Sequence, residues 1–190
     1  MPDMELKGFK NVHIAAPVWI IGTGPSLNNL KRSDIGKGVV ITLNRAIEKI
    51  EDLEVNNIVY SMQKDGSSPE FINCCPYKTC DKCPYDLPTP KRAVLLVHEL
   101  ESKECKPDYW PRLVFNNNDF DLEWNAFSAL SAIKIAQHLG CNKFNFVSFD
   151  ACVNNDSKTA FGTELSLYLQ QAKVMKEFIK DLDHNFITPC

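Results

Sequence analysis

The segment 18–27 constrains the fold more than any other part of this 190-residue chain. It reads Val-Trp-Ile-Ile-Gly-Thr-Gly-Pro-Ser-Leu, so a short apolar run ends in a turn with two glycines, and a helix is predicted to begin at the proline. Glycines permit a sharp turn and let backbone N–H groups approach a ligand. A strand, such a turn and a helix together predict an α/β fold whose loop holds a phosphate, most simply that of a nucleotide.

The glycine loop has a second interpretation, in which it is a turn between a strand and a helix that binds nothing. It lacks the third glycine of the dinucleotide-binding fingerprint, and it has no Gly-Lys-Ser/Thr of a P-loop. The loop therefore predicts an anion site without naming the ligand.

Short apolar runs recur along the chain and alternate with helical patterns. Continuous runs of this kind suit parallel strands that are covered on both faces. Strands are predicted at about 18–22, 38–43, 57–62, 93–97, 112–115, 143–148 and 185–188, and helices over about 124–139 and 164–182. The alternation predicts an α/β protein with a single doubly wound, mostly parallel, Rossmann-like sheet. In such sheets, ligands bind at the carboxyl ends of the strands.

The length predicts one domain over 1–190, which the alternation of strands and helices makes Rossmann-like and the glycine loop makes nucleotide-binding. Within it, 66–90 is predicted to be a Cys-rich insertion, because this stretch has neither a strand nor a helix period. The net charge of −3 argues against a basic surface for nucleic acid. No apolar run approaches the roughly 20 residues of a membrane span. The polar stretch 1–10 carries no signal-peptide core, so a cytoplasmic location is expected.

Polar side chains follow several predicted strands, at the edge where a ligand is expected. Asn44 and Arg45 come after the second strand, and Asp65 comes after the third. Ser148 and Asp150 come after the sixth. Each of these residues is also a common turn former or surface charge, but their shared position with the glycine loop favours a binding site. Arg45 is a candidate partner for a phosphate. Asp65 and Asp150 are candidates to hold Mg²⁺ through water.

Four segments occur in an order that resembles the bacterial CMP-sialic-acid-dependent sialyltransferases. The segments are 22–27, 43–45, 125–128 and 139–150. The same order is similar to 6-hydroxymethylpterin pyrophosphokinase-like proteins and to glycosyltransferases of flagellin modification. The resemblance covers roughly 17–65 and 124–188, about two-thirds of the chain. It implies a nucleotide or nucleotide sugar of the CMP type as ligand, with the following binding residues: Gly22, Thr23, Gly24, Ser26, Asn44, Ser128 and Asp150.

The sequence departs from the sialyltransferases where they carry a histidine general base. That histidine lies in a lid between the late Asp and the last helix, and here the stretch 151–164 contains none. A general base must reach the proton that it takes, so no catalytic residue is assigned. Three hypotheses follow. The first is nucleotide-dependent group transfer of the glycosyltransferase type. The second is a nucleotide-binding module without catalysis, and the third is a pyrophosphokinase-like enzyme, whose chemistry depends more on metal and positioning.

Eight cysteines are a high count for a chain of this class, and four lie within the insertion. The spacing of Cys80 and Cys83 suits two ligands of one tetrahedral metal. Cys75 is the expected third ligand and Cys105 the fourth, with Cys74 and His98 as substitutes, which predicts a structural zinc site. Free or disulfide-linked thiols and an iron–sulfur cluster are the alternatives.

Overall fold

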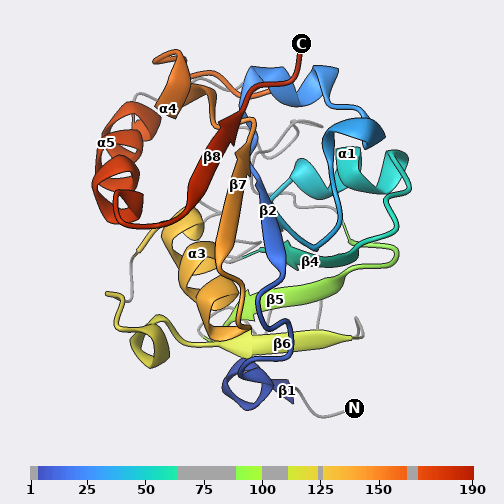
Figure 1. Ribbon diagram of the computed structural model, residues 1–190, viewed down its shortest axis with the longest axis vertical. Coiled ribbons are helices and arrows are strands. Elements are labelled where there is room, and N and C mark those ends of the chain that lie inside the picture. The colour runs from blue at the N-terminus through green and yellow to red at the C-terminus, as the bar shows by residue number, and fades with distance from the viewer. Residues whose placement is uncertain (1–3, 64–88, 100–110, 124–125, 162–166) are drawn as a thin grey trace, which may run out of the picture.

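The computed structural model describes residues 4–63, 89–99, 111–123, 126–161 and 167–190 (Figure 1). In this part of the chain, eight strands form one sheet in the order β1-β6-β5-β4-β3-β2-β7-β8. Every pair of neighbours is parallel. The strands are β1 (Met4–Glu5), β2 (Pro17–Ile21), β3 (Val39–Leu43), β4 (Ile58–Met62), β5 (Val94–His98), β6 (Arg112–Phe115), β7 (Lys143–Val147) and β8 (His184–Ile187).

Helices cover both faces of this sheet. They are α1 (Ala46–Asp52), α3 (Ser128–His138), α4 (Asp150–Val153) and α5 (Leu167–Ile179), with the 3-10 helices η1 (Leu6–Phe9), η2 (Pro25–Asn29), η3 (Arg32–Asp34) and η4 (Asn117–Phe120). Apolar side chains of α3 and α5 pack on one face, while those of α1 and η2 pack on the other. Figure 1 shows α3 and α5 together on the opposite side from α1. The predicted doubly wound α/β fold is confirmed.

The strands form where the sequence has continuous apolar runs. All five residues of β3 are buried, and Val39, Val40 and Ile41 are β-branched residues that pack well on a pleated surface. The seven predicted strands agree with β2 to β8 to within a residue at each end. The two-residue strand β1, which pairs with β6, was not predicted because it is too short to show a period.

The order of the strands fixes where a ligand is expected. After the short strand β1 at one edge, the chain forms β2 in the interior of the sheet and moves outward through β3, β4, β5 and β6, so that β6 lies beside β1. It then returns to the other side of β2 to form β7 and β8. The strand order therefore reverses between β2 and β7. In doubly wound sheets, ligands bind outside the carboxyl ends of the strands at this reversal.

The helix predicted at Pro25 is the 3-10 helix η2 of five residues, so the aligned dipole of an α-helix is not available to the glycine loop. Asn28 and Asn29 are poor helix formers, which explains the early end.

The insertion at 66–90 lies almost entirely outside the described residues. Among the described residues, no helix is long and apolar enough to cross a membrane.

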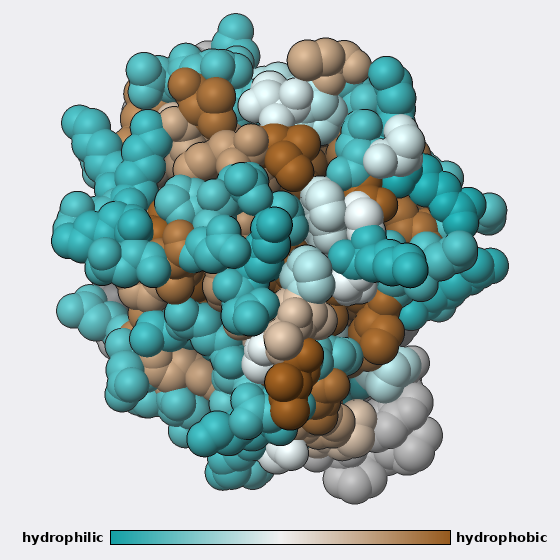
Figure 2. Space-filling model, viewed as in Figure 1, coloured by the Kyte–Doolittle hydropathy of each residue, from teal (hydrophilic) through white to brown (hydrophobic). Residues whose placement is uncertain are grey.

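The surface that faces the viewer in Figure 2 is mainly hydrophilic, with separate apolar spots. Among the described residues, the exposed large apolar side chains come from separate parts of the chain, and they are Val12, Ile14, Ile58, Val153, Leu167 and Val174. Scattered apolar side chains of this kind are normal for a water-exposed surface.

Candidate functional site

The glycine loop lies directly on the segment that follows β7. Because β2 and β7 are parallel and Ile21 pairs with Val147, both loops leave the sheet at the same carboxyl edge. The N–H of Gly22 donates to the carbonyl of Val147 (2.8 Å), and the N–H of Gly24 donates to the carbonyl of Ser148 (2.9 Å). A Cβ on Gly22 would come within 2.7 Å of the Ser148 oxygen. The glycines are therefore required by the approach of the protein's own backbone.

The carboxylate of Asp150 occupies the anion-binding position of this loop. Its Oδ2 accepts hydrogen bonds from the Ser26 hydroxyl (2.8 Å) and from the Ser26 N–H (3.3 Å). Asp150 is 5% exposed and is the first residue of α4. A phosphate at the same place would meet this negative charge at close range. While the Asp150 contact is made, a phosphate must bind beside the loop and not on the amides of Gly24 and Ser26.

Asn44 and Ser148 occupy equivalent places on the two sides of β2. Asn44 follows β3 and Ser148 follows β7, and both have left-handed backbone conformations, with φ of 50° and 59°. Their N–H groups donate to Met62 and Ile187 carbonyls on the next strands outward. A left-handed residue other than glycine costs roughly 1–2 kcal/mol, although Asn tolerates it better than Ser. Two such residues beside the reversal in strand order mark this edge as strained.

Both residues also carry a buried polar atom that no described residue pairs with. Neither the Oδ1 of Asn44 nor the Oγ of Ser148 makes a hydrogen bond to any residue that the structure describes. Ser148 is 1% exposed. A buried polar atom left unpaired costs roughly 1–3 kcal/mol, and such atoms are rare in native proteins. The two atoms fit a ligand that offers hydrogen bonds at the ends of β3 and β7.

The segment 155–161 crosses over the glycine loop. The N–H of Ala160 donates to the Thr23 carbonyl (2.8 Å), so the crossing segment is tied to the middle of the loop. Ala160 and Phe161 pack against the apolar cluster formed by Ile21, Leu27 and their neighbours. The Phe161 ring lies against Arg45, with 4.3 Å between the guanidinium carbon and the ring centroid. The crossing segment therefore links the loops that follow β2 and β3.

Ser128 begins α3, the helix that leads from the carboxyl end of β6 back to the start of β7. This path places Ser128 at the same edge as the glycine loop, where it is 8% exposed. The structure thus brings every predicted nucleotide-binding residue to the carboxyl edge. Those from the loops of β2, β3 and β7 lie side by side, since these three strands are adjacent.

Sequence reasoning missed the place of His98 at this edge. His98 is the last residue of β5 and is 3% exposed. The N–H of Asn117 donates to the Nε2 of His98, with 3.5 Å between the two nitrogens. Asn117 in turn accepts a hydrogen bond from the hydroxyl of Ser131 in α3 (2.8 Å). The signal in the sequence is a polar residue at the end of the apolar run Val-Leu-Leu-Val-His, where His98 was predicted as a substitute metal ligand.

The predicted metal ligands lie outside the described residues, with the exception of His98. This applies to Cys74, Cys75, Cys80, Cys83 and Cys105, and also to Asp65. In the part of the chain that the structure describes, no three His, Cys, Asp or Glu side chains gather as a metal site. Cys141 and Cys152 are buried free thiols, and burial raises the pKa of each to about 11. They behave as small apolar core residues.

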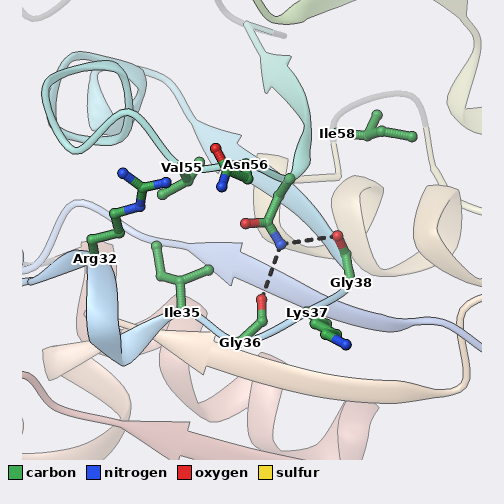
Figure 3. Close-up of a pocket in the computed structure, with 9 residues that line it drawn as sticks. Arg32, Ile35, Gly36, Lys37, Gly38, Val55, Asn56 and Ile58 are labelled. Atoms are coloured by element: carbon green, nitrogen blue, oxygen red, sulfur yellow. Dashed lines mark hydrogen bonds between the residues drawn. The ribbon is translucent and has the colours of Figure 1, made fainter.

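A hollow of about 400 Å³ lies at the opposite edge of the sheet, before β3 and β4 (Figure 3). Its lining includes Arg32, Ile35 and Lys37. The side-chain amide of Asn57 donates to the carbonyls of Gly36 and Gly38, both at 3.0 Å, and so fixes the turn that precedes β3. None of the predicted binding residues lines this hollow.

Comparisons with known proteins give no family. No family model matches the chain, and no curated protein matches it. Two solved structures of the sialyltransferase CstII from Campylobacter jejuni are similar at 15% identity. The complex with cytidine-5'-monophosphate matches 93% of this chain and 81% of its own, with a TM-score of 0.37. The complex with CMP-3FNeuAc matches 92% and 82%, with a TM-score of 0.36. These scores are too low to support an assignment of fold or function.

Proposed function

We propose that this chain binds a nucleotide or nucleotide sugar at the carboxyl ends of β2, β3 and β7, and that it transfers the group which the nucleotide carries, as a glycosyltransferase does. The observation that carries the proposal is the pair of buried polar atoms on Asn44 and Ser148 that make no hydrogen bond to the described residues. They lie on either side of the strand where the sheet order reverses, which is the expected ligand position in this fold.

Each residue of the edge has a role that its surroundings suit. The amide of Asn44 and the hydroxyl of Ser148 can each donate and accept a hydrogen bond, as sugar hydroxyls and base edges require. Asp150 holds the glycine loop through Ser26, and its remaining acceptor positions suit a ribose hydroxyl or a hydrated Mg²⁺. The resemblance to sialyltransferases in sequence suggests a CMP-type donor.

A second candidate is a nucleotide-binding module without catalysis. The stretch 151–164 has no histidine to serve as general base, and the Asp150 carboxylate is already bound to Ser26. A module of this kind would bind the nucleotide but would not release product from a nucleotide sugar. A pyrophosphokinase-like enzyme differs from both because it would require Mg²⁺ and a nucleoside triphosphate.

Thermal denaturation with CMP, UDP, GDP and ATP, each with and without Mg²⁺, tests the binding step. A ligand that binds only the native state at 100 times its Kd raises stability by about 2.7 kcal/mol. At millimolar concentration, one of these nucleotides should raise the midpoint of the wild-type protein. If none does, the proposal is wrong. Release of free nucleotide from CMP-, UDP- or GDP-sugars, measured by chromatography, then separates the transferase from the binding module.

Two variants connect binding to the unpaired atoms. Asn44→Gly keeps a residue that tolerates the left-handed backbone and removes the amide. Ser148→Ala removes a buried hydroxyl that no described residue pairs with, so each variant should be at least as stable as the wild type. Both should lose the nucleotide-dependent rise in the midpoint. Variants that bind the nucleotide with unchanged affinity would show that the ligand does not contact these atoms.

A further inference from the structure

Most hydrogen-bond donors of the glycine loop are engaged within the protein, so a phosphate at this edge needs a further partner. The Asp150 carboxylate occupies the Ser26 hydroxyl and N–H, and the N–H groups of Gly22 and Gly24 donate to backbone carbonyls. We infer that Arg45 binds the anionic group of the ligand, and that Glu48 and Phe161 hold its guanidinium in place for this purpose. This inference rests on the proposed function, because it assigns the phosphate of the proposed nucleotide to one side chain.

The position of Arg45 meets the first requirement of such a role. It directly follows Asn44, so it leaves the sheet at the carboxyl end of β3, next to the loop that follows β2. The crossing segment 155–161 brings Phe161 onto Arg45 while it is tied to Thr23 of the glycine loop. Arg45 therefore belongs to the same group of loops as the unpaired Asn44 and Ser148 atoms.

Glu48 holds the Arg45 guanidinium through only part of its N–H donors. Its Nε donates to one carboxylate oxygen of Glu48 (2.8 Å), and its Nη2 donates to the other (3.3 Å). A guanidinium has five N–H donors, so this contact leaves three for another acceptor. Stacking of Phe161 at 4.3 Å restrains the plane further. A planar fork with open donors is suited to a phosphate or carboxylate.

Partial burial reduces the screening of the Arg45 charge, which the paired Glu48 carboxylate partly offsets while it orients the guanidinium. The Arg45 side chain is 24% exposed and its Glu48 partner 38%. Charges in such surroundings are screened less than exposed ones. An arginine that is oriented in advance also loses less conformational freedom when it binds an anion. Both effects favour phosphate binding at Arg45 over binding at an exposed lysine.

The test compares ligands with and without phosphate on the same variants. Dissociation constants are measured by calorimetry for cytidine, CMP and inorganic pyrophosphate with wild type, Arg45→Met and Arg45→Lys. The control is Arg32→Met, which makes the same substitution at an exposed arginine lining the hollow at the opposite edge (Figure 3). Urea denaturation without ligand confirms that each variant is folded. If the nucleotide screen selects another base, the matching nucleoside and monophosphate replace cytidine and CMP.

Arg45→Met should weaken CMP binding by about 10- to 100-fold, the range for loss of a charge-assisted hydrogen bond, and should leave cytidine unchanged. Arg45→Lys should fall between Met and wild type, because it keeps the charge but loses the fork. Arg32→Met should bind all three ligands like wild type. If Arg45→Met weakens cytidine and CMP equally, or weakens neither, the inference is wrong while the proposed function stands.

The remaining outcomes separate this inference from the proposed function. Wild-type protein that binds pyrophosphate through Arg45 but binds no nucleoside or nucleotide would refute the nucleotide proposal and support an anion site at Arg45. Wild-type protein that binds neither pyrophosphate nor any nucleotide would refute both.

Discussion

Replacement of Gly24 by alanine tests the arrangement of the glycine loop most directly. A Cβ at this position would lie 2.6 Å from the carbonyl oxygen of Ser148 and 2.8 Å from the Cγ of Asp150. Both separations are well below van der Waals contact, and the Ser148 oxygen is a backbone atom whose movement would disturb the end of β7. The new methyl group must therefore push the loop and the carboxylate apart.

The expected cost follows from the contacts that would be lost. Separation breaks the hydrogen bond from the Ser26 hydroxyl to Asp150 and leaves a carboxylate that is 5% exposed without that donor. Loss of a hydrogen bond to a charged group and overpacking of a tight site each cost between 1 and 3 kcal/mol, so Gly24→Ala should lower the free energy of unfolding by about 3 kcal/mol. For a chain of this size, the melting midpoint should fall by about 6–12 °C.

Urea and thermal denaturation followed by circular dichroism measure this change. Gly8→Ala is the matched control, because a Cβ there meets no atom within 4 Å and its effect should stay within about 0.5 kcal/mol. In an Asp150→Ala background, Gly24→Ala should cost at least about 1 kcal/mol less than in the wild type, since one of its two obstacles is gone. A Gly24→Ala protein as stable as wild type, or an unchanged cost in the Asp150→Ala background, would refute the reasoning.

Two further predictions concern other parts of the molecule. Asn57→Ala should lower the free energy of unfolding by about 1–2 kcal/mol, because it removes both hydrogen bonds that fix the turn before β3, whereas exposed Asn56→Ala should change it by less than about 0.5 kcal/mol in the same urea assay. Burial lowers the pKa of His13, whose Nε2 lies 2.8 Å from the Tyr60 hydroxyl. As the pH falls, this histidine is therefore protonated in the unfolded state before it is protonated in the folded state. The free energy of unfolding should then decrease as the pH drops below about 6.5. The difference in unfolding free energy between wild type and His13→Gln, measured from pH 7.5 to pH 5, should shrink toward the acid end, and a difference that does not change with pH would contradict this assignment.

The strands could be predicted from the sequence because a strand that is buried on both faces consists of consecutive apolar residues, which is a local pattern. Runs such as Val39-Val40-Ile41 need no knowledge of their neighbours to be recognised, and parallel strands with helices between them leave few topologies. The helix α3 was predicted from about residue 124 and begins at Ser128. Ends of elements depend on capping contacts, which periodicity does not report.

The role of the glycines could not be predicted, because it depends on residues far away in the chain. Gly22 and Gly24 read as room for a ligand, but in the structure the space beside them holds the Ser148 carbonyl and the Asp150 side chain. The contact between Ser26 and Asp150 joins residues 124 positions apart. Glycine spacing shows that something must approach the loop closely, and only the fold shows what it is.

Two independent deviations from ordinary protein structure coincide at this edge and favour a ligand there. Seven residues other than glycine have positive φ in the described part of the chain, and five of them, Asn44 included, lie in turns. The Oδ1 of Asn44 and the Oγ of Ser148 are among the buried side-chain polar atoms that make no hydrogen bond to the described residues. Only Asn44 and Ser148 belong to both groups. Strain and unpaired polar atoms each lower stability, and native proteins keep them mainly where function requires them. Both deviations occur at the ends of the two strands that flank β2, where the strand order reverses. A binding site built on this fold would require such a position.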